Sequence, residues 1–152
     1  MKLAEALALR AEQQKRMAQL AGRMVRNAKT QEGEPPAEDP NALLNEYNQV
    51  ARQLVLLVQR INRTNSSTAM EGYGTIADAI AARDGLRLRA DTHRQLADAG
   101  IVTQNAYSRS EIKFRTMVSV AALQAEADSL SRQHRELDTA IQSLNWTTEL
   151  VE

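Results

Sequence analysis

Cysteine is absent from this chain of 152 residues, and large aromatic side chains are scarce, with one Phe, one Trp and three Tyr. Without cysteine, disulfide bonds and thiolate metal sites are excluded. The formal net charge is zero, which argues against general binding to nucleic acid. No apolar run approaches the roughly 18 residues that a membrane-spanning helix needs. Glu5, Glu12 and Gln13 interrupt the apolar residues of the first segment, unlike a secretion signal. We therefore expect a cytoplasmic protein that binds neither nucleic acid nor a membrane.

The scarcity of bulky residues also bears on how the chain forms a core. A compact chain of this length buries about 68–70% of its unfolded surface. Here alanine supplies much of the apolar fraction, so each helix has a narrow apolar stripe. Such helices often complete their burial against another subunit. We expect one helical domain over residues 1–152 that forms a homo-oligomer.

The stretch from Asp39 to Asn65 is the most strongly specified part of the chain. Asp39 is a good helix N-cap, and Pro40 fits the first helical position. Apolar side chains then recur at alternating spacings of four and three, at Leu43, Tyr47, Val50, Leu54, Leu57 and Ile61. This pattern predicts a helix roughly 40 Å long. Leu44, Ala51, Val55 and Val58 widen the stripe, so we expect this helix to touch more than one neighbour.

Three further helices are predicted around it, over residues 2–29, 75–99 and 120–146. Thr75 and Asp78 form a variant capping box, and Gly100 is a suitable stop. The predicted fold class is therefore mostly α, with four long helices in a bundle or coiled-coil-like assembly. A small β strand or hairpin is expected around residues 101–118, because polar and apolar residues alternate over residues 110–118. Its partner is residues 101–107, residues 68–75 or the same strand of another subunit.

Polar residues suited to a binding site gather near the predicted helix ends. Arg63, Arg83, Arg109 and Lys113 would hold a small anion if they converged, with Asn62 and Asn65 as further donors. The full set of candidate ligand-binding residues is Asn62, Arg63, Asn65, Arg83, Asp84, Tyr107, Arg109, Glu111, Lys113, Asn145 and Trp146. The alternative, which we favour, is structural: Asn closes helix ends and Arg–Asp pairs tie elements together. We expect Trp146 to be largely buried, with its indole N–H hydrogen-bonded.

The two histidines, His93 and His134, lie on core-facing positions of the third and last predicted helices. They would suit a shared metal or a pH switch, but no HExxH motif accompanies them, so we favour ordinary histidines. No Ser-His-Asp set, phosphate-binding glycine loop or paired-carboxylate motif is present. We therefore expect no catalytic residue, no metal and no cofactor.

Several short stretches together resemble a known family. They are Met1-Lys-Leu-Ala-Glu-Ala-Leu7, Gln31-Glu-Gly-Glu34, Glu38-Asp-Pro40, Ile61-Asn-Arg-Thr-Asn65, Tyr107-Ser-Arg-Ser-Glu-Ile-Lys113 and Asn145-Trp-Thr-Thr-Glu-Leu150. The chain resembles short bacterial proteins that are labelled septicolysin or domains of unknown function. This resemblance implies a mostly helical bacterial protein and supplies no catalytic residues. The label itself implies a membrane-active toxin.

Three functions follow from these observations. The leading hypothesis is a cytoplasmic, non-enzymatic, oligomeric scaffold or interaction protein. The alternative is a protein or enzyme that binds a small anionic ligand through the Arg/Asn/Tyr cluster. A septicolysin-like cytolysin ranks third, because the sequence has no spanning helix and no convincing amphipathic hairpin of lipid-facing length.

Overall fold

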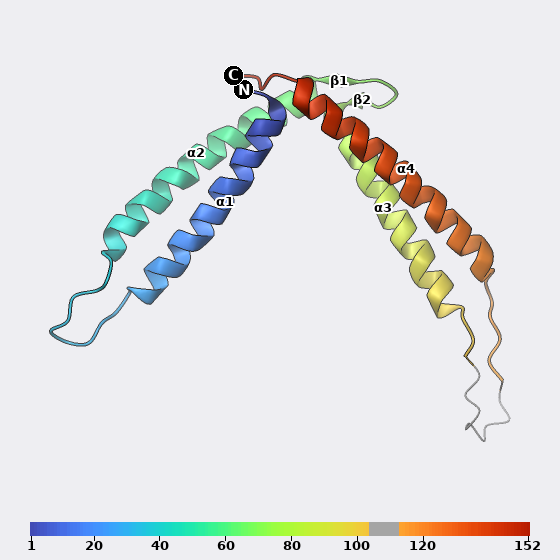
Figure 1. The fold of residues 1–152 in the computed structure, drawn as a ribbon, viewed down its shortest axis with the longest axis horizontal. Coiled ribbons are helices and arrows are strands. Elements are labelled where there is room, and N and C mark those ends of the chain that lie inside the picture. The colour runs from blue at the N-terminus through green and yellow to red at the C-terminus, as the bar shows by residue number, and fades with distance from the viewer. Residues whose placement is uncertain (104–112) are drawn as a thin grey trace. The chain divides into compact units, whose positions relative to one another are not determined.

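A computed structural model describes residues 1–103 and 113–152 of the chain. Over these residues it contains four α-helices and a short two-stranded β-hairpin (Figure 1). The helices are α1 (Leu3–Arg26), α2 (Pro40–Ser67), α3 (Ile76–Ala99) and α4 (Val120–Thr147). The strands are β1 (Ala69–Met70) and β2 (Gly74–Thr75). The predicted mostly α fold with four long helices and a small β element is confirmed.

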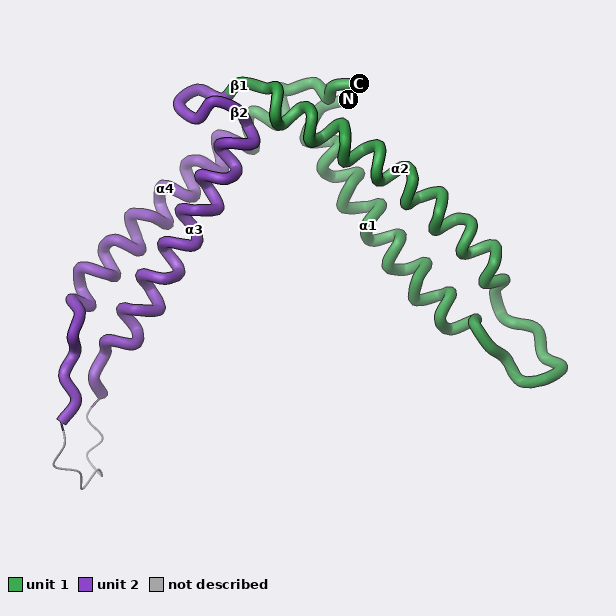
Figure 2. Tube along the Cα trace, turned by 180° about the vertical axis from the view of Figure 1, so that it is seen from behind, with its two compact units in different colours: residues 1–69, 142–152 green, residues 70–141 purple. Residues whose placement is uncertain are grey.

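The chain divides into two compact units (Figure 2). Unit 1 comprises residues 1–69 and 142–152, and unit 2 comprises residues 70–141. In unit 1, α1 and α2 lie side by side as a helical hairpin, joined by the loop that contains Pro35 and Pro36. The last residues of the chain complete this unit.

Local sequence explains where α2 begins and which of its faces is buried. Asp39 is the N-cap, and its Oδ1 accepts a hydrogen bond from the Asn41 amide at 2.9 Å, with Pro40 at the first helical position. The predicted stripe faces inward, because Leu43, Val50, Leu57 and Ile61 are all buried. Leu43 and Val50 pack with Leu20 of α1 to form a core, which Met17, Met24 and Tyr47 extend. Both the helix start and its core face are thus confirmed.

In unit 2, α3 and α4 lie side by side in both views (Figures 1 and 2). The predicted capping box starts α3: the Asp78 amide donates to Thr75 Oγ1 at 3.2 Å, and the Thr75 amide donates to Asp78 Oδ2 at 3.0 Å. The Asp78 carboxylate accepts a second hydrogen bond, from the Thr75 hydroxyl, which is the main reason that the pKa of Asp78 lies below its usual value. This box fixes the first turn of α3.

Among the described residues the β element lies at residues 69–75, whereas residues 104–112, the middle of the stretch predicted as a strand or hairpin, lie outside the described residues. Gly72 and Gly74 have positive φ angles of 80° and 96°, and the Tyr73 amide donates to the Met70 carbonyl at 3.1 Å. Residues 68–75, considered above as a partner for another strand, therefore pair with themselves. The described residues nearest the predicted strand, 101–103 and 113–118, form no strand. For these described residues, alternation of polar and apolar residues was not a sufficient signal of a strand, because any extended backbone has the same period.

Trp146 is also not where the sequence placed it. Its side chain is 63% exposed, at the C-terminal end of α4. Ile141 and Asn145 are buried four residues apart on one side of the helix, and the next residue is turned by about 100° from that side. The prediction of a largely buried Trp146 was wrong because helical phase, and not residue size, decides which side chain is covered.

Candidate functional site

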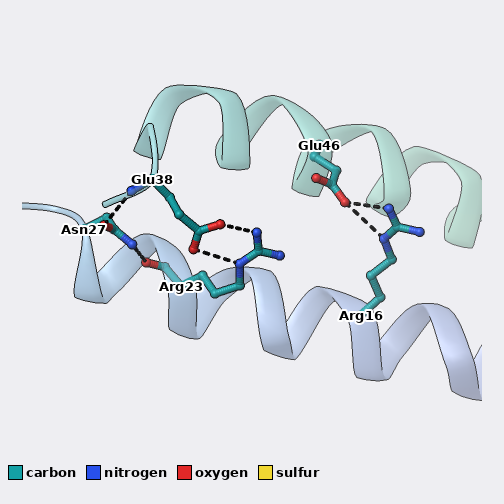
Figure 3. Close-up of polar contacts among 5 residues, drawn as sticks. All are labelled: Arg16, Arg23, Asn27, Glu38 and Glu46. Atoms are coloured by element: carbon teal, nitrogen blue, oxygen red, sulfur yellow. Dashed lines mark hydrogen bonds and ion pairs between the residues drawn. The ribbon is translucent and has the colours of Figure 1, made fainter. Parts of the chain in front are cut away.

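Polar contacts fix α1 against α2 in unit 1. Arg16 donates from Nε and Nη2 to Glu46 Oε1, at 3.1 and 2.6 Å, and Arg23 makes a two-pronged contact with Glu38 (Figure 3). Asn27 continues this row, because its Oδ1 accepts the Glu38 amide at 3.0 Å. The hydrogen bond from Arg23 holds the pKa of the Glu38 carboxyl below its usual value. These pairs link fixed positions of the two helices and so set the register of the hairpin. Because they are partly exposed, they contribute only modestly to its stability.

The two ends of the chain meet in unit 1. Residues 1–3 and 147–150 form a short antiparallel contact, in which the Leu3 amide donates to the Thr148 carbonyl and the Leu150 amide to the Met1 carbonyl, each at 2.9 Å. Glu149 adds ion pairs to Lys2 Nζ at 2.6 Å and to the N-terminal ammonium at 3.2 Å. This contact attaches the C-terminal segment to the start of α1.

Three residues near the end of α2 hold the same segment. The Thr64 hydroxyl is fully buried; it accepts the Val151 amide at 3.0 Å and donates to the Arg60 carbonyl at 2.8 Å. Arg60 Nε donates to the Val151 carbonyl at 3.0 Å, and Arg63 Nη1 donates to the main-chain oxygen of Glu152 at 2.9 Å. Arg60 and Thr64 are not among the residues that the sequence predicted for a site. Their spacing of four on one helix face was the available signal.

The ion pairs of Glu149 predict a specific pH dependence. The Lys2 hydrogen bond, and then that of the N-terminal ammonium, hold the pKa of Glu149 below its usual value in the folded protein. A carboxyl with a lowered folded pKa stabilises the fold above its unfolded pKa, and this contribution is lost as the pH falls through the folded pKa. We expect Glu149→Gln to lose less stability on acidification than the unaltered protein, as measured by urea unfolding at neutral and acidic pH. Glu32→Gln, in an exposed loop, should follow the unaltered protein; equal acid sensitivity of all three would contradict this role.

The predicted anion-binding residues are distributed over both units. Asn62, Arg63, Asn65, Asn145 and Trp146 belong to unit 1, and Arg83, Asp84 and Lys113 belong to unit 2. Tyr107, Arg109 and Glu111 lie outside the described residues. Arg63 donates to the main-chain oxygen of Glu152, and Arg63, Asn62 and Lys113 are all exposed. Anion binding by this cluster stays a prediction.

In unit 2, Arg83 links α3 to α4. Its Nη1 donates to Asp138 Oδ1 at 2.9 Å, and its Nε and Nη2 donate to Asp84 Oδ1 at 3.0 and 2.8 Å. Further along the same pair of helices, Arg94 Nη2 donates to Ser131 Oγ at 3.1 Å. Arg83 therefore has the role that the structural interpretation gave to an Arg–Asp pair, tying two helices together.

Asn145 is the buried member of the predicted set. Its side chain is 3% exposed, and its Oδ1 has no hydrogen-bond partner among the described residues. His93 and His134 are both half-buried, and His93 Nδ1 lies 2.7 Å from the Arg89 carbonyl of its own helix. Within residues 1–103 and 113–152, no three His, Asp or Glu side chains gather in a way that could hold a metal ion.

Apolar side chains are exposed at two places that lie outside the predicted set of anion-binding residues. On α2, Leu44, Val55 and Leu56 are exposed, and a shallow apolar groove is lined by Ala51, Arg52, Val55 and Leu56. At the end of the α3–α4 pair, a cavity of about 490 Å³ is lined by residues 96 and 99–103 on one side and 114–118 on the other. The apolar pattern predicts contacts of Leu44 and Val55 with a further neighbour, and no described residue covers them fully.

The fold thus defines a class of protein built from two units of paired helices. A family of unknown function, DUF6847, matches residues 10–150, and the chain belongs to this family. A functionally unknown conserved protein from Corynebacterium diphtheriae, known from a crystal structure, is 42% identical; the match covers 99% of each chain, with a TM-score of 0.93. No curated protein is significantly similar to the chain.

These comparisons correct the resemblance to septicolysin-like proteins, which was wrong. The matching family has no assigned function, and the similar crystal structure is of a functionally unknown protein. Asp39-Pro40 begins α2 and Asn145-Trp146 lies at the end of α4. Residues that begin and end helices recur in unrelated helical proteins. In the part of the chain that the structure describes, no helix combines the length and apolarity that crossing a membrane requires.

Proposed function

We propose that the protein is a non-enzymatic interaction protein that works in the cytoplasm as a homo-oligomer. The observation that carries this proposal is the row of exposed apolar side chains on α2, where Leu44 is 45% and Val55 is 55% exposed. Single exposed apolar residues are ordinary in monomers, but a row along one helix marks a contact surface. The chain has few bulky residues with which to bury these side chains itself. A second subunit would cover them.

The contacts that Arg63 and Arg83 make within the protein support a structural role for these two arginines. Arg83 is paired with the carboxylates of Asp84 and Asp138, and Arg63 donates from Nη1 to the main-chain oxygen of Glu152. A ligand anion at Arg83 would have to compete with these two carboxylates. The proposal therefore gives these arginines a part in fixing the helices that carry the contact surface.

Sedimentation velocity of the full chain tests this proposal. We expect the weight-average sedimentation coefficient to rise with concentration through the micromolar range and to reach a plateau above that of a 16.9 kDa monomer. A coefficient that stays at the monomer value throughout this range would contradict the proposal. The result does not depend on which surface forms the contact, so it tests whether the chain oligomerises without testing where the subunits meet.

A further inference from the structure

A second heptad row runs along α2 beside the buried stripe. It consists of Asn41, Leu44, Asn48, Ala51, Val55, Val58, Asn62 and Asn65, and we call it the outer seam. Its residues alternate at spacings of three and four, as in the contact line of a coiled coil. The inward residues Leu43, Val50 and Leu57 belong to the other stripe, so α2 carries two distinct apolar lines.

The outer seam is open to a partner along its length. Leu44 and Val55 are exposed, Ala51 and Val58 are half-buried, and Asn48 and Asn62 are exposed. The small Ala51 side chain helps form the shallow groove next to Val55. In helix–helix contacts, side chains of one helix insert between residues of the other, and a small residue leaves room for this.

The chemistry of the outer seam indicates what covers it. None of its eight residues is charged, although a quarter of the chain is Asp, Glu, Lys or Arg. Its polar members are all Asn, and Asn41, Asn48 and Asn62 share one heptad position with Val55. An Asn amide carries both donors and an acceptor, so it pairs with a second copy of itself. An Asn at this position of a coiled coil fixes register and favours a two-stranded contact, at a cost in stability.

We propose that the outer seam is the contact between two copies of this chain, with their α2 helices parallel and in register. This inference deepens the proposed function and rests on it. In this register Asn48 faces Asn48 and Asn62 faces Asn62 of the second copy, and Val55 faces Val55 between them. Each amide is then paired, and the apolar residues form the layers between the amides.

Other orientations of a second copy pair these residues less well. In the antiparallel register that places Val55 opposite Ala51, Asn48 lies opposite Val58 and Asn62 lies opposite Leu44. The amides of Asn48 and Asn62 then face apolar side chains, although Asn41 lies opposite Asn65, and an unpaired polar group removed from water costs about 1–3 kcal/mol. In the parallel in-register arrangement, each Asn faces an Asn and each apolar residue faces an apolar residue. The sequence of the outer seam therefore favours this arrangement.

The absence of cysteine makes disulfide cross-linking a direct test. Asn48→Cys places one thiol on the seam, and facing residues at this heptad position approach to within the roughly 4.4–6.8 Å between Cα atoms that a disulfide needs. With a mild oxidant, we expect Asn48→Cys to form a covalent dimer. Gln53→Cys, an exposed position on the same helix away from the seam, is the matched control and should remain largely uncross-linked.

A mixture of two variants distinguishes the orientations. If the helices were antiparallel, Asn48→Cys mixed with Val58→Cys would cross-link with each other, while Asn48→Cys alone would not. That result would overturn the parallel register and leave the homo-oligomer intact. Cross-linking of Asn48→Cys alone, at a yield well above that of Gln53→Cys, is the result that we expect.

A charge on the seam provides the second measurement. Val55 is exposed in the single chain, so Val55→Glu should leave helix content unchanged while it places two like charges against each other in the dimer. We expect the dissociation constant to rise by about 100-fold or more, equivalent to about 2.7 kcal/mol. Gln53→Glu is the matched control and should leave this constant within about threefold.

The outcomes separate this inference from the proposed function. An unaltered chain that oligomerises, but whose Val55→Glu variant associates equally well, would overturn the seam and leave the oligomer standing. An unaltered chain that remains monomeric throughout the micromolar range would overturn both. Loss of association in Val55→Glu alone, together with the Asn48→Cys disulfide, would support the seam.

Discussion

Leu20→Ala is expected to lower the free energy of unfolding by about 2–5 kcal/mol, the range for removing a buried leucine side chain. Leu20 is 1% exposed and packs against Leu43 and Val50, at the centre of the α1–α2 core. The loss combines the lost burial of the removed atoms with the cavity left behind. Urea unfolding followed by far-ultraviolet circular dichroism would measure it on the full chain.

The matched control for this prediction is Leu88→Ala on α3. Leu88 is 69% exposed and lies in unit 2, outside both the α1–α2 core and the exposed face of α2, so the same chemical change should alter stability by less than about 0.5 kcal/mol. Equal losses for the two variants would mean that the α1–α2 core does not hold unit 1 together. A loss confined to Leu20→Ala would identify that core as the source of its stability.

Two glycines of unit 2 should respond to alanine with opposite signs. Gly85 lies within α3 with open space around its Cα, so Gly85→Ala should stabilise the protein by about 0.5–1 kcal/mol through helix propensity. Gly100 follows α3, and a Cβ there would lie 2.6 Å from Val118 Cγ2 and 3.1 Å from Thr116 Oγ1. Gly100→Ala should therefore destabilise the protein by about 1–3 kcal/mol, because β-branched Val118 has little freedom to move away.

Thermal unfolding of the two glycine variants beside the unaltered protein would check these signs. The backbone of Gly100 has φ −79° and ψ −10°, which alanine adopts without strain, so any loss comes from the crowded contact alone. If both variants were stabilised equally, residues 116–118 would not approach the end of α3 in solution. Opposite shifts of the midpoint are the expected result.

The sequence predicted best where a few neighbouring residues determine the structure. Asp39 with Pro40 and Thr75 with Asp78 located the starts of α2 and α3, because capping depends on side chains within three residues of the helix start. The buried stripe of α2 followed from helical periodicity alone. Gly100 was correctly predicted as the residue at which α3 stops; its φ is −79° rather than positive, and a Cβ there would crowd Val118.

Features set by distant parts of the chain could not be predicted. The attachment of Val151 and Glu152 to Arg60, Arg63 and Thr64 joins residues far apart in sequence, so no local pattern reports it. For the same reason, the contact of Arg63 with the main-chain oxygen of Glu152 has no signal in the sequence around Arg63. The alternation over residues 110–118 gave no strand at its described residues, 113–118, because a period of two does not distinguish a paired strand from other extended backbone.

Sedimentation equilibrium of the unaltered protein tests the central claim most directly, namely that a second copy of the chain covers the exposed face of α2. At micromolar concentrations we predict a molar mass approaching twice 16.9 kDa, which falls to 16.9 kDa on dilution. Val55→Glu should give 16.9 kDa throughout, whereas Gln53→Glu should match the unaltered protein. A single, well-folded 16.9 kDa species for the unaltered chain at every concentration would contradict the account.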